Sequence, residues 1–252
     1  MRKRIFPTLC CLSAGLLLTG CAALMRTAER EPLPAQLLVV TTGDWSAGNA
    51  LLQRYERQGP SEPWWSAVGE PIPAAVGRNG MAWGRGIHRE ARSQEPEKRE
   101  GDGKTPAGMF TLGPAFGYAG SDEVPGVRIP YRQMTERDKC VDDPASPLYN
   151  RLVNEREVEK NWQSHEEMRR EDEQYRLGVV IGHNSAPVVP RAGSCIFLHI
   201  WKAPDQGTAG CTAVAAADME TLLAWLRPEE NPVIVQLPRA EYERVRIPWG
   251  LP

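Results

Sequence analysis

Cysteine and histidine are the residue types in this sequence that are best suited to covalent chemistry. The four histidines are His88, His165, His183 and His199, and none of them follows Cys211. A thiol becomes an effective nucleophile when a neighbouring imidazole takes its proton. His199 stands near the end of an apolar run shortly before Cys211, so a turn of the chain can bring the two side chains together. We therefore predict Cys211 as a nucleophile and His199 as its proton acceptor and donor.

The residues around Cys211 suit acyl transfer. Gly207 and Gly210 lack a Cβ, which lets backbone N–H groups approach a bound carbonyl closely, as an oxyanion hole requires. After Cys211, an apolar repeat at helical spacing predicts a helix that ends at Pro228. The repeat consists of Met219, Leu222, Leu223 and Leu226. Because a helix N-terminus favours a nearby thiolate, we expect a lowered pKa for Cys211.

The elements that must position these residues are mainly strands. Short apolar runs separated by turn residues predict a mostly β domain with a few helices. The predicted strands are Gln36 to Thr42, Leu177 to Ile181, Cys195 to Trp201 and Pro232 to Leu237, while Ala50 to Gln58 fits a strand or a helix. Residues 89–104 are highly charged and predict an exposed loop. Ser164 and Glu167 form an S-x-x-E capping box, which predicts a short helix after Ser164.

Two segments resemble a known family. The stretch GSCIFLHIWKAPDQGTAGCTAV is similar to the signature of L,D-transpeptidase (YkuD-type) catalytic domains, in which a strand-borne histidine precedes an [S/T]-x-G-C motif. The matching residues are His199 and Thr208-Ala209-Gly210-Cys211. Upstream, GDGKTPAGMFTLG at Gly101 to Gly113 matches a K-T-P-x-G-x-F segment of the same domains. The resemblance extends loosely from Leu37 to Leu237.

The resemblance implies a β-rich sandwich or barrel, a single catalytic domain and peptidoglycan stem peptides as substrate. It implies a thioester on Cys211, with His199 exchanging protons and the backbone of Gly210 and Ala209 near the oxyanion. His183 either lines this site or caps a strand. No metal or organic cofactor is expected, and His165 lacks further metal ligands at useful spacing.

The sequence departs from the family pattern at several points. Ala209 stands where many members have a second histidine, and Ala213 stands where many have an arginine. Arg78 and Lys104 are the candidates to replace that cation. The polar segment 131–175 looks like an insertion, which would form a lid over the cleft. Three functions remain open: transpeptidation to another stem or an envelope protein, hydrolysis as an L,D-carboxypeptidase, and non-catalytic peptidoglycan binding.

The N-terminus predicts a lipoprotein. Arg2, Lys3 and Arg4 precede an apolar stretch that is too short to span a bilayer as a helix. It ends in Leu18-Thr19-Gly20-Cys21, which resembles a lipobox and implies lipid on Cys21. We expect a signal peptide at 1–20, a lipidated N-terminus and tether at 21–35, and the catalytic domain at 36–252. Ala22 favours the outer membrane of a Gram-negative host, with the domain facing the periplasm.

Composition limits the other possibilities. A hydrophobic content of 41% with 25% charged residues is ordinary for a globular protein, and a net charge of −2 argues against nucleic acid as a partner. Besides Cys21, the mature chain would hold Cys140, Cys195 and Cys211. Three cysteines cannot all pair within one chain, so at least one thiol stays free. We expect Cys195 to pack as a small hydrophobic residue in its strand, and Cys140 to be a free or paired surface thiol.

Overall fold

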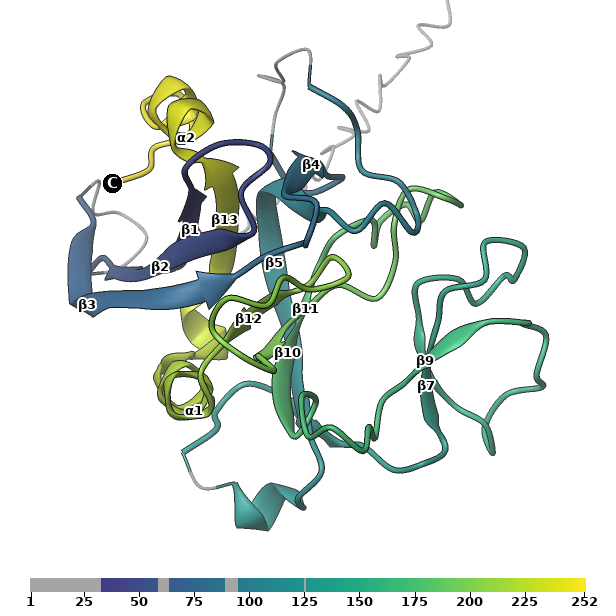
Figure 1. The fold of residues 1–252 in the computed structure, drawn as a ribbon. Coiled ribbons are helices and arrows are strands. Elements are labelled where there is room, and N and C mark those ends of the chain that lie inside the picture. The colour runs from purple at the N-terminus through teal and green to yellow at the C-terminus, as the bar shows by residue number, and fades with distance from the viewer. Residues whose placement is uncertain (1–32, 59–63, 89–94, 125) are drawn as a thin grey trace, which may run out of the picture. The chain divides into compact units, whose positions relative to one another are not determined.

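The computed structural model describes residues 33–58, 64–88, 95–124 and 126–252 (Figure 1). The predicted signal peptide, Cys21 and most of the tether lie outside the described residues. The described residues from Leu33 onward belong to one compact unit, in agreement with a single domain. Among the described residues, no helix is both long and apolar enough to cross a membrane.

A ten-stranded sheet forms the centre of this unit, and the mostly β fold is confirmed. Its main path runs β10-β11-β12-β3-β2-β1-β13-β5-β4, and an additional pairing of β10 with β5 closes it into a barrel-like ring. The strands on this path are β1 (Gln36–Thr42), β2 (Asn49–Glu56), β3 (Ser66–Ala75), β4 (Met81–Trp83), β5 (Thr105–Gly117), β10 (Leu177–Ile181), β11 (Phe197–Ile200), β12 (Thr212–Val214) and β13 (Val233–Pro238). β6 (Tyr131–Gln133) pairs with β5 off this path.

The apolar runs of the sequence account for the interior of the ring. β1 reads QLLVVTT and lies between β2 and β13, so nearly all of its residues are buried. The helix α1 (Ala216–Trp225) packs against β10 and β11, and α2 (Arg239–Val245) packs against β13 and β1. Met219, Leu222 and Leu223 supply the buried face of α1, as the helical repeat predicts. Burial of one such leucine side chain contributes roughly 1.5–3 kcal/mol.

The predicted strands are confirmed, with small shifts of their ends, and the segment from Ala50 to Gln58 is a strand rather than a helix. The helix expected after Ser164 is wrong, because residues His165–Glu167 form strand β9. β9 pairs with β7 (Asp138–Val141), and Lys139 of β7 forms an ion pair with Glu167. The Glu167 carboxylate therefore pairs across the sheet instead of capping a helix.

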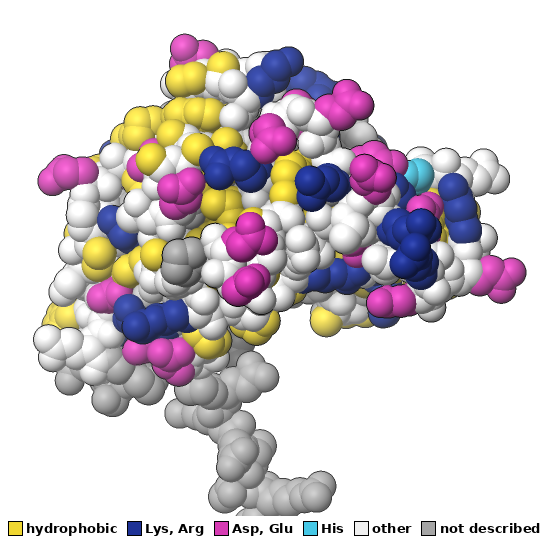
Figure 2. Space-filling view, turned by 90° about the horizontal axis from the view of Figure 1, so that it is seen from below, with side chains coloured by type: hydrophobic (Ala, Val, Ile, Leu, Met, Phe, Trp, Pro, Cys, Tyr) yellow, Lys and Arg dark blue, Asp and Glu magenta, His cyan; other side chains and the backbone are white. Residues whose placement is uncertain are grey.

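The polar segment 131–175 contains a second, three-stranded sheet of order β8-β7-β9, in which β8 spans Leu152–Asn154 (Figure 1). The charged segment before β5 is described from residue 95 to residue 104, where it is a loop with mostly exposed or half-buried residues, as we expected, while residues 89–94 lie outside the described part. Lys98 is an exception, since it is buried, and its ammonium group bonds to Asp102 at 2.6 Å and to the Arg99 carbonyl at 2.7 Å. Figure 2 shows basic and acidic side chains interspersed on one face of the molecule.

Candidate active site

Cys211 and His199 lie on neighbouring parallel segments. In the β11–β12 ladder, His199 stands opposite Ala213, and Cys211 directly precedes β12. Side chains two residues apart along a strand share one face of a sheet, so the thiol and the imidazole face the same side. Both residues are buried, and both line one cavity of about 300 Å³. The structure therefore brings together the two residues that we predicted as the reacting pair.

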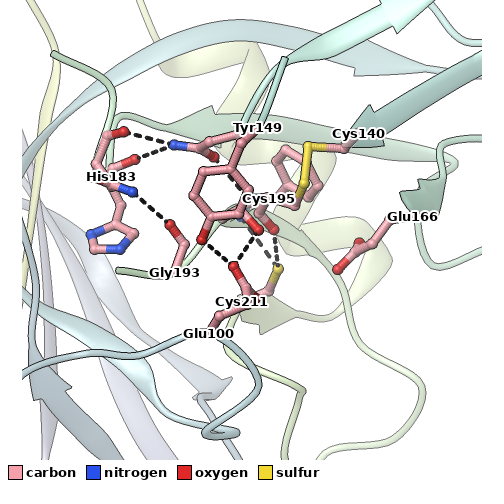
Figure 3. Close-up of a disulfide and its surroundings, with 12 residues drawn as sticks. Glu100, Cys140, Tyr149, Glu166, His183, Gly193, Cys195 and Cys211 are labelled. Atoms are coloured by element: carbon pink, nitrogen blue, oxygen red, sulfur yellow. Dashed lines mark hydrogen bonds between the residues drawn. A yellow bond between two sulfur atoms is a disulfide. The ribbon is translucent and has the colours of Figure 1, made fainter. Parts of the chain in front are cut away.

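Backbone groups hold the Cys211 thiol in place (Figure 3). The Phe197 N–H donates to Sγ at 3.3 Å, and the thiol lies 3.5 Å from the Cys195 carbonyl oxygen. Burial raises the thiol pKa to about 12, although the Phe197 N–H and the Tyr175 hydroxyl lower it. The prediction that a helix N-terminus lowers the pKa of Cys211 is wrong. Strand β12 separates Cys211 from α1, which begins only at Ala216.

The His199 imidazole is oriented by the carbonyl of the next residue. Its Nδ1 lies 2.8 Å from the Ile200 carbonyl oxygen, which can only accept a hydrogen bond. Nδ1 therefore carries the proton, and the Nε2 lone pair remains available to take another. The Tyr175 ring packs edge-on against the imidazole at 5.0 Å. Burial lowers the pKa of His199 to about 4, so the ring is neutral at pH 7.

Thr105 and Thr208 fix the turn that carries Cys211. The Thr105 hydroxyl lies 2.9 Å from the Gly210 carbonyl and 3.0 Å from the Cys211 carbonyl. The Thr208 hydroxyl donates to the Cys211 carbonyl at 2.6 Å and accepts from the Gly210 N–H at 3.0 Å. Gly210 has a φ of 155°, and a Cβ there would lie 3.1 Å from the Lys104 carbonyl. The two segments noted in the sequence thus meet at the nucleophile, and Ala209 and Gly210 line its cavity.

A family model for the L,D-transpeptidase catalytic domain (YkuD) matches residues 49–235. The chain belongs to the L,D-transpeptidase family. No curated protein matches it. The match spans both motif segments and the strands that hold Cys211 and His199.

His183 is the predicted site residue that the structure does not bring to the cavity of this L,D-transpeptidase domain (Figure 3). Its Nδ1 accepts the Arg85 N–H at 3.2 Å, and its Nε2 bonds to the Ala192 carbonyl at 2.9 Å. Both ring nitrogens are therefore occupied, and burial lowers the pKa of His183 to about 4. The imidazole secures the loop between β10 and β11.

A disulfide joins the inserted segment to the loop before β11. Cys140 on β7 is bonded to Cys195 (Figure 3), so the prediction that Cys195 is merely a packed hydrophobic residue is wrong. The pairing could not be read from the sequence, because cysteine count and spacing do not fix connectivity. Cys211 is the free cysteine of the described residues, in agreement with the argument that one thiol must stay free.

The inserted segment forms a wall of the cavity. Asn150 accepts the Cys195 N–H at 2.9 Å and donates to the carbonyls of His183 and Asn184, so the segment is fixed to the domain by more than the disulfide. The cavity residues that come from the inserted segment or directly precede β10 are Asp142, Glu166, Arg170, Gln174 and Tyr175. None of these residues was predicted, since the insertion carries no periodicity or motif that points to the cavity.

Arg78 lines the cavity, but Lys104 does not. The Lys104 ammonium group donates to the Asn79 carbonyl at 3.0 Å. Of the two cations that we proposed to replace the missing arginine, only Arg78 is therefore placed beside Cys211. In the part of the chain that the structure describes, no cluster of three His, Cys, Asp or Glu residues is arranged to hold a metal ion.

Proposed function

We propose that this L,D-transpeptidase family member is an active cysteine enzyme that acts on peptidoglycan stem peptides through a thioester on Cys211. The observation that carries the proposal is the free thiol of Cys211, which faces the same cavity as the neutral, oriented imidazole of His199. The two residues stand on segments that the family model matches.

The reaction has two halves. Nε2 of His199 takes the proton of the Cys211 thiol as Sγ attacks the carbonyl carbon between the L-centre of a diamino acid and the terminal D-residue. The tetrahedral intermediate collapses to a thioester, and the leaving amine takes a proton from the protonated His199. An incoming nucleophile then attacks the thioester, gives its proton to Nε2 of His199, and Cys211 leaves as the thiolate or thiol. The nucleophile is the amine of a second stem, a lysine of an envelope protein, or water.

The charge pattern of the cavity supports a stem peptide as ligand. Arg78, Lys98 and Arg170 line it together with Glu100, Asp142 and Glu166. A stem peptide carries both carboxylates and an amine, and each needs a partner of opposite charge when it leaves water.

Hydrolysis is the second candidate function. Ala213 is completely buried opposite His199, so this position of β12 presents no cation to an acceptor stem. A weakly held acceptor competes less well with water for the thioester.

We further propose that lipid on Cys21 anchors the domain in the bacterial cell envelope, facing the periplasm. Labelling with a fatty-acid analogue should mark the wild type and not the Cys21→Ala variant. Equal labelling of both proteins would contradict the anchor.

Incubation with purified disaccharide-tetrapeptide and mass analysis of the products tests the proposed activity. The wild type should convert the substrate, while Cys211→Ala and His199→Ala should each reduce turnover by about 1000-fold or more. The double variant should be no worse than either single one, because the two residues act as a unit. The control is Tyr131→Phe, which loses a hydroxyl bond to the Ala119 carbonyl outside the cavity.

A carbapenem probe separates the enzyme from a non-catalytic peptidoglycan binder. Digestion and mass mapping should locate a stoichiometric adduct on Cys211 of the wild type. Absence of the adduct in folded protein, or full turnover by Cys211→Ala, would overturn the proposed function.

A further inference from the structure

The second sheet turns one of its faces toward the nucleophile. Asp142 directly follows β7 and stands two residues after Cys140, so the two side chains share a face. Glu166 of β9 stands opposite Cys140 and belongs to the same face. The disulfide from Cys140 to Cys195 fixes this face beside Cys211, because the Cys195 carbonyl oxygen lies 3.5 Å from Sγ. Figure 3 shows the Glu166 carboxylate directed toward the Cys211 sulfur.

The two carboxylates of this face lack a counter-charge. Oε2 of Glu166 accepts the Tyr175 hydroxyl at 2.5 Å, and Oε1 makes no hydrogen bond among the described residues. Oδ1 of Asp142 is buried without a hydrogen-bond partner, and neither carboxylate forms an ion pair within the described part of the chain. Both residues line the cavity of Cys211. Because an unpaired carboxylate is costly to remove from water, the cavity has a place for a positive charge.

Two of the three cations that line the cavity are bonded to carboxylates of their own. The Lys98 ammonium group lies 2.6 Å from Asp102, and the Arg170 guanidinium lies 2.6 Å from Asp172. Desolvation raises the pKa of Glu166 to about 7, and the charge of Arg170 does not offset this rise. The counter-charge for Glu166 is therefore left to a ligand.

We propose that Glu166 and Asp142 form a subsite for the side-chain ammonium group of the diamino acid in the stem peptide. This proposal rests on the proposed function and deepens it, because it names the part of the stem that the inserted segment recognises. A primary ammonium group has three N–H donors and no acceptor. One of them bonds to Oε1 of Glu166, while the positive charge also offsets the Asp142 carboxylate. Glu166 binds substrate and takes no part in the proton transfers of Cys211 and His199.

The stem peptide carries this ammonium group close to the bond that is cleaved. The side chain of a diamino acid ends in an amine only a few carbon atoms from the carbonyl that Sγ attacks, so both groups enter the same cavity of about 300 Å³. Tyr175 holds Glu166 ready for the amine, since its ring packs edge-on against Phe116 at 5.9 Å and Phe197 at 5.5 Å. A carboxylate that is already fixed loses little conformational freedom when it binds a cation.

Calorimetric binding to the full chain with Cys211→Ala, which cannot form the thioester, tests the subsite. The ligands are disaccharide-tetrapeptide and the same compound with its side-chain amine acetylated. Acetylation removes the positive charge and should weaken binding by roughly tenfold, the effect of one charge-assisted hydrogen bond. Adding Glu166→Gln should weaken binding of the free amine by the same factor and leave the acetylated ligand unchanged. The amide can still accept the Tyr175 hydroxyl but has lost the charge.

Glu167→Gln is the matched control. Glu167 is the next residue of β9, but its carboxylate pairs with Lys139 and lies outside the cavity, so both affinities should stay unchanged. Equal binding of the two ligands before Glu166 is changed would overturn the subsite, as would failure to bind the free amine. A merely structural role for Glu166 would weaken both ligands equally in Glu166→Gln, and this result would overturn the subsite too.

Steady-state turnover by the chain with Cys211 intact separates this proposal from the proposed function. Glu166→Gln should raise KM for the free-amine tetrapeptide by roughly tenfold and leave kcat nearly unchanged, because the ammonium group is bound alike before and during the reaction. Turnover of both ligands by the wild type with the same KM would overturn the subsite and leave the proposed function standing. Amine-dependent binding without turnover by the wild type would overturn the proposed function and leave the subsite standing.

Discussion

At the scale of single residues, burial dominates the chemistry of the cavity. It raises the pKa of Cys211 to about 12 and of Glu166 to about 7, and it lowers the pKa of His199 to about 4. Each shift favours the neutral form of the group. The thiol of Cys211 and the imidazole of His199 are therefore neutral at pH 7, and in the proposed mechanism proton transfer must accompany the attack on substrate.

The meeting of Cys211 and His199 at one cavity could be predicted from the sequence, because a histidine, a glycine and a cysteine stand in the order of a recognisable motif. Glu166 could not be predicted as a cavity residue, since it reaches the cavity through the pairing of β9 with β7. The pKa of the Cys211 thiol could not be predicted either. The helical repeat after Cys211 does not reveal that strand β12 separates the cysteine from α1.

His183 gives a prediction at this scale. His183→Ala leaves the Arg85 N–H and the Ala192 carbonyl without their buried partner, so the free energy of unfolding should fall by about 2–4 kcal/mol. The folded-state pKa of His183 is about 4, below the unfolded value near 6.5. Its contribution is therefore present above pH 6.5 and is lost as the pH falls toward 4. His199 contributes with the same sign, so the wild type should lose stability in this window and the variant should lose less.

Denaturant unfolding at pH 7.5 and pH 5 measures the effect of His183→Ala. His165→Ala is the matched control, because the Nε2 of His165 bonds to the exposed Glu167 carboxylate and should contribute little. An unchanged stability of His183→Ala at pH 7.5 would contradict the role of this imidazole in holding the loop.

At the scale of elements, the sequence predicts the ring better than the insertion. β1, β10, β11 and β13 are apolar runs bounded by turn residues, so their existence follows from burial on both sides. The second sheet consists of three- and four-residue strands with many charges, and such strands carry no periodicity. The Lys139–Glu167 ion pair joins two of these strands, and the disulfide ties the sheet to the rest of the domain. Both contacts join residues that are far apart in the sequence, so the sequence alone did not indicate them.

The disulfide gives the prediction at the scale of elements. Cys140 and Cys195 are 55 residues apart, and closing a loop of this length stabilises the fold by about 4 kcal/mol through the entropy of the unfolded chain. A Cys140→Ala/Cys195→Ala double variant should show this loss in denaturant unfolding. Alkylation of Cys211 should also change, because the Cys195 carbonyl contacts the thiol.

Cys211→Ala is the matched control for removal of a buried cysteine without loss of the bridge, and it should lose less stability. Equal stabilities of the double variant and the wild type would mean that the bridge does not constrain the unfolded chain. An unchanged alkylation rate in the double variant would show that Asn150 alone positions the Cys195 backbone.

At the scale of the whole molecule, three separate parts of the chain supply the cations of one cavity. Lys98 comes from the segment before β5, Arg170 from the insertion, and Arg78 from the turn after β3. Lys98 is paired with Asp102, and Arg170 is paired with Asp172. Among the cavity cations in the described part of the chain, Arg78 has no ion-pair partner. Ala213 stands where the resemblance would place an arginine, and of the two cations that we suggested as its replacement the fold brings Arg78 to the cavity.

This arrangement predicts a mixed outcome for the thioester. With Ala213 in place of an arginine, we expect Arg78 to be the main group that holds an acceptor stem, so hydrolysis to tripeptide should accompany cross-linking in the wild type. Arg78→Ala should lower the ratio of cross-linked dimer to tripeptide by roughly tenfold, the equivalent of losing one charge-assisted hydrogen bond of about 1.5 kcal/mol. Arg128→Ala, which removes an exposed cation outside the cavity, is the control and should leave the ratio unchanged.

Mass analysis of the products from disaccharide-tetrapeptide gives the amounts of cross-linked dimer and of tripeptide. Dimers linked between two diamino acids with little tripeptide in the wild type would refute the hydrolytic component, and an unchanged ratio in Arg78→Ala would show that another group holds the acceptor.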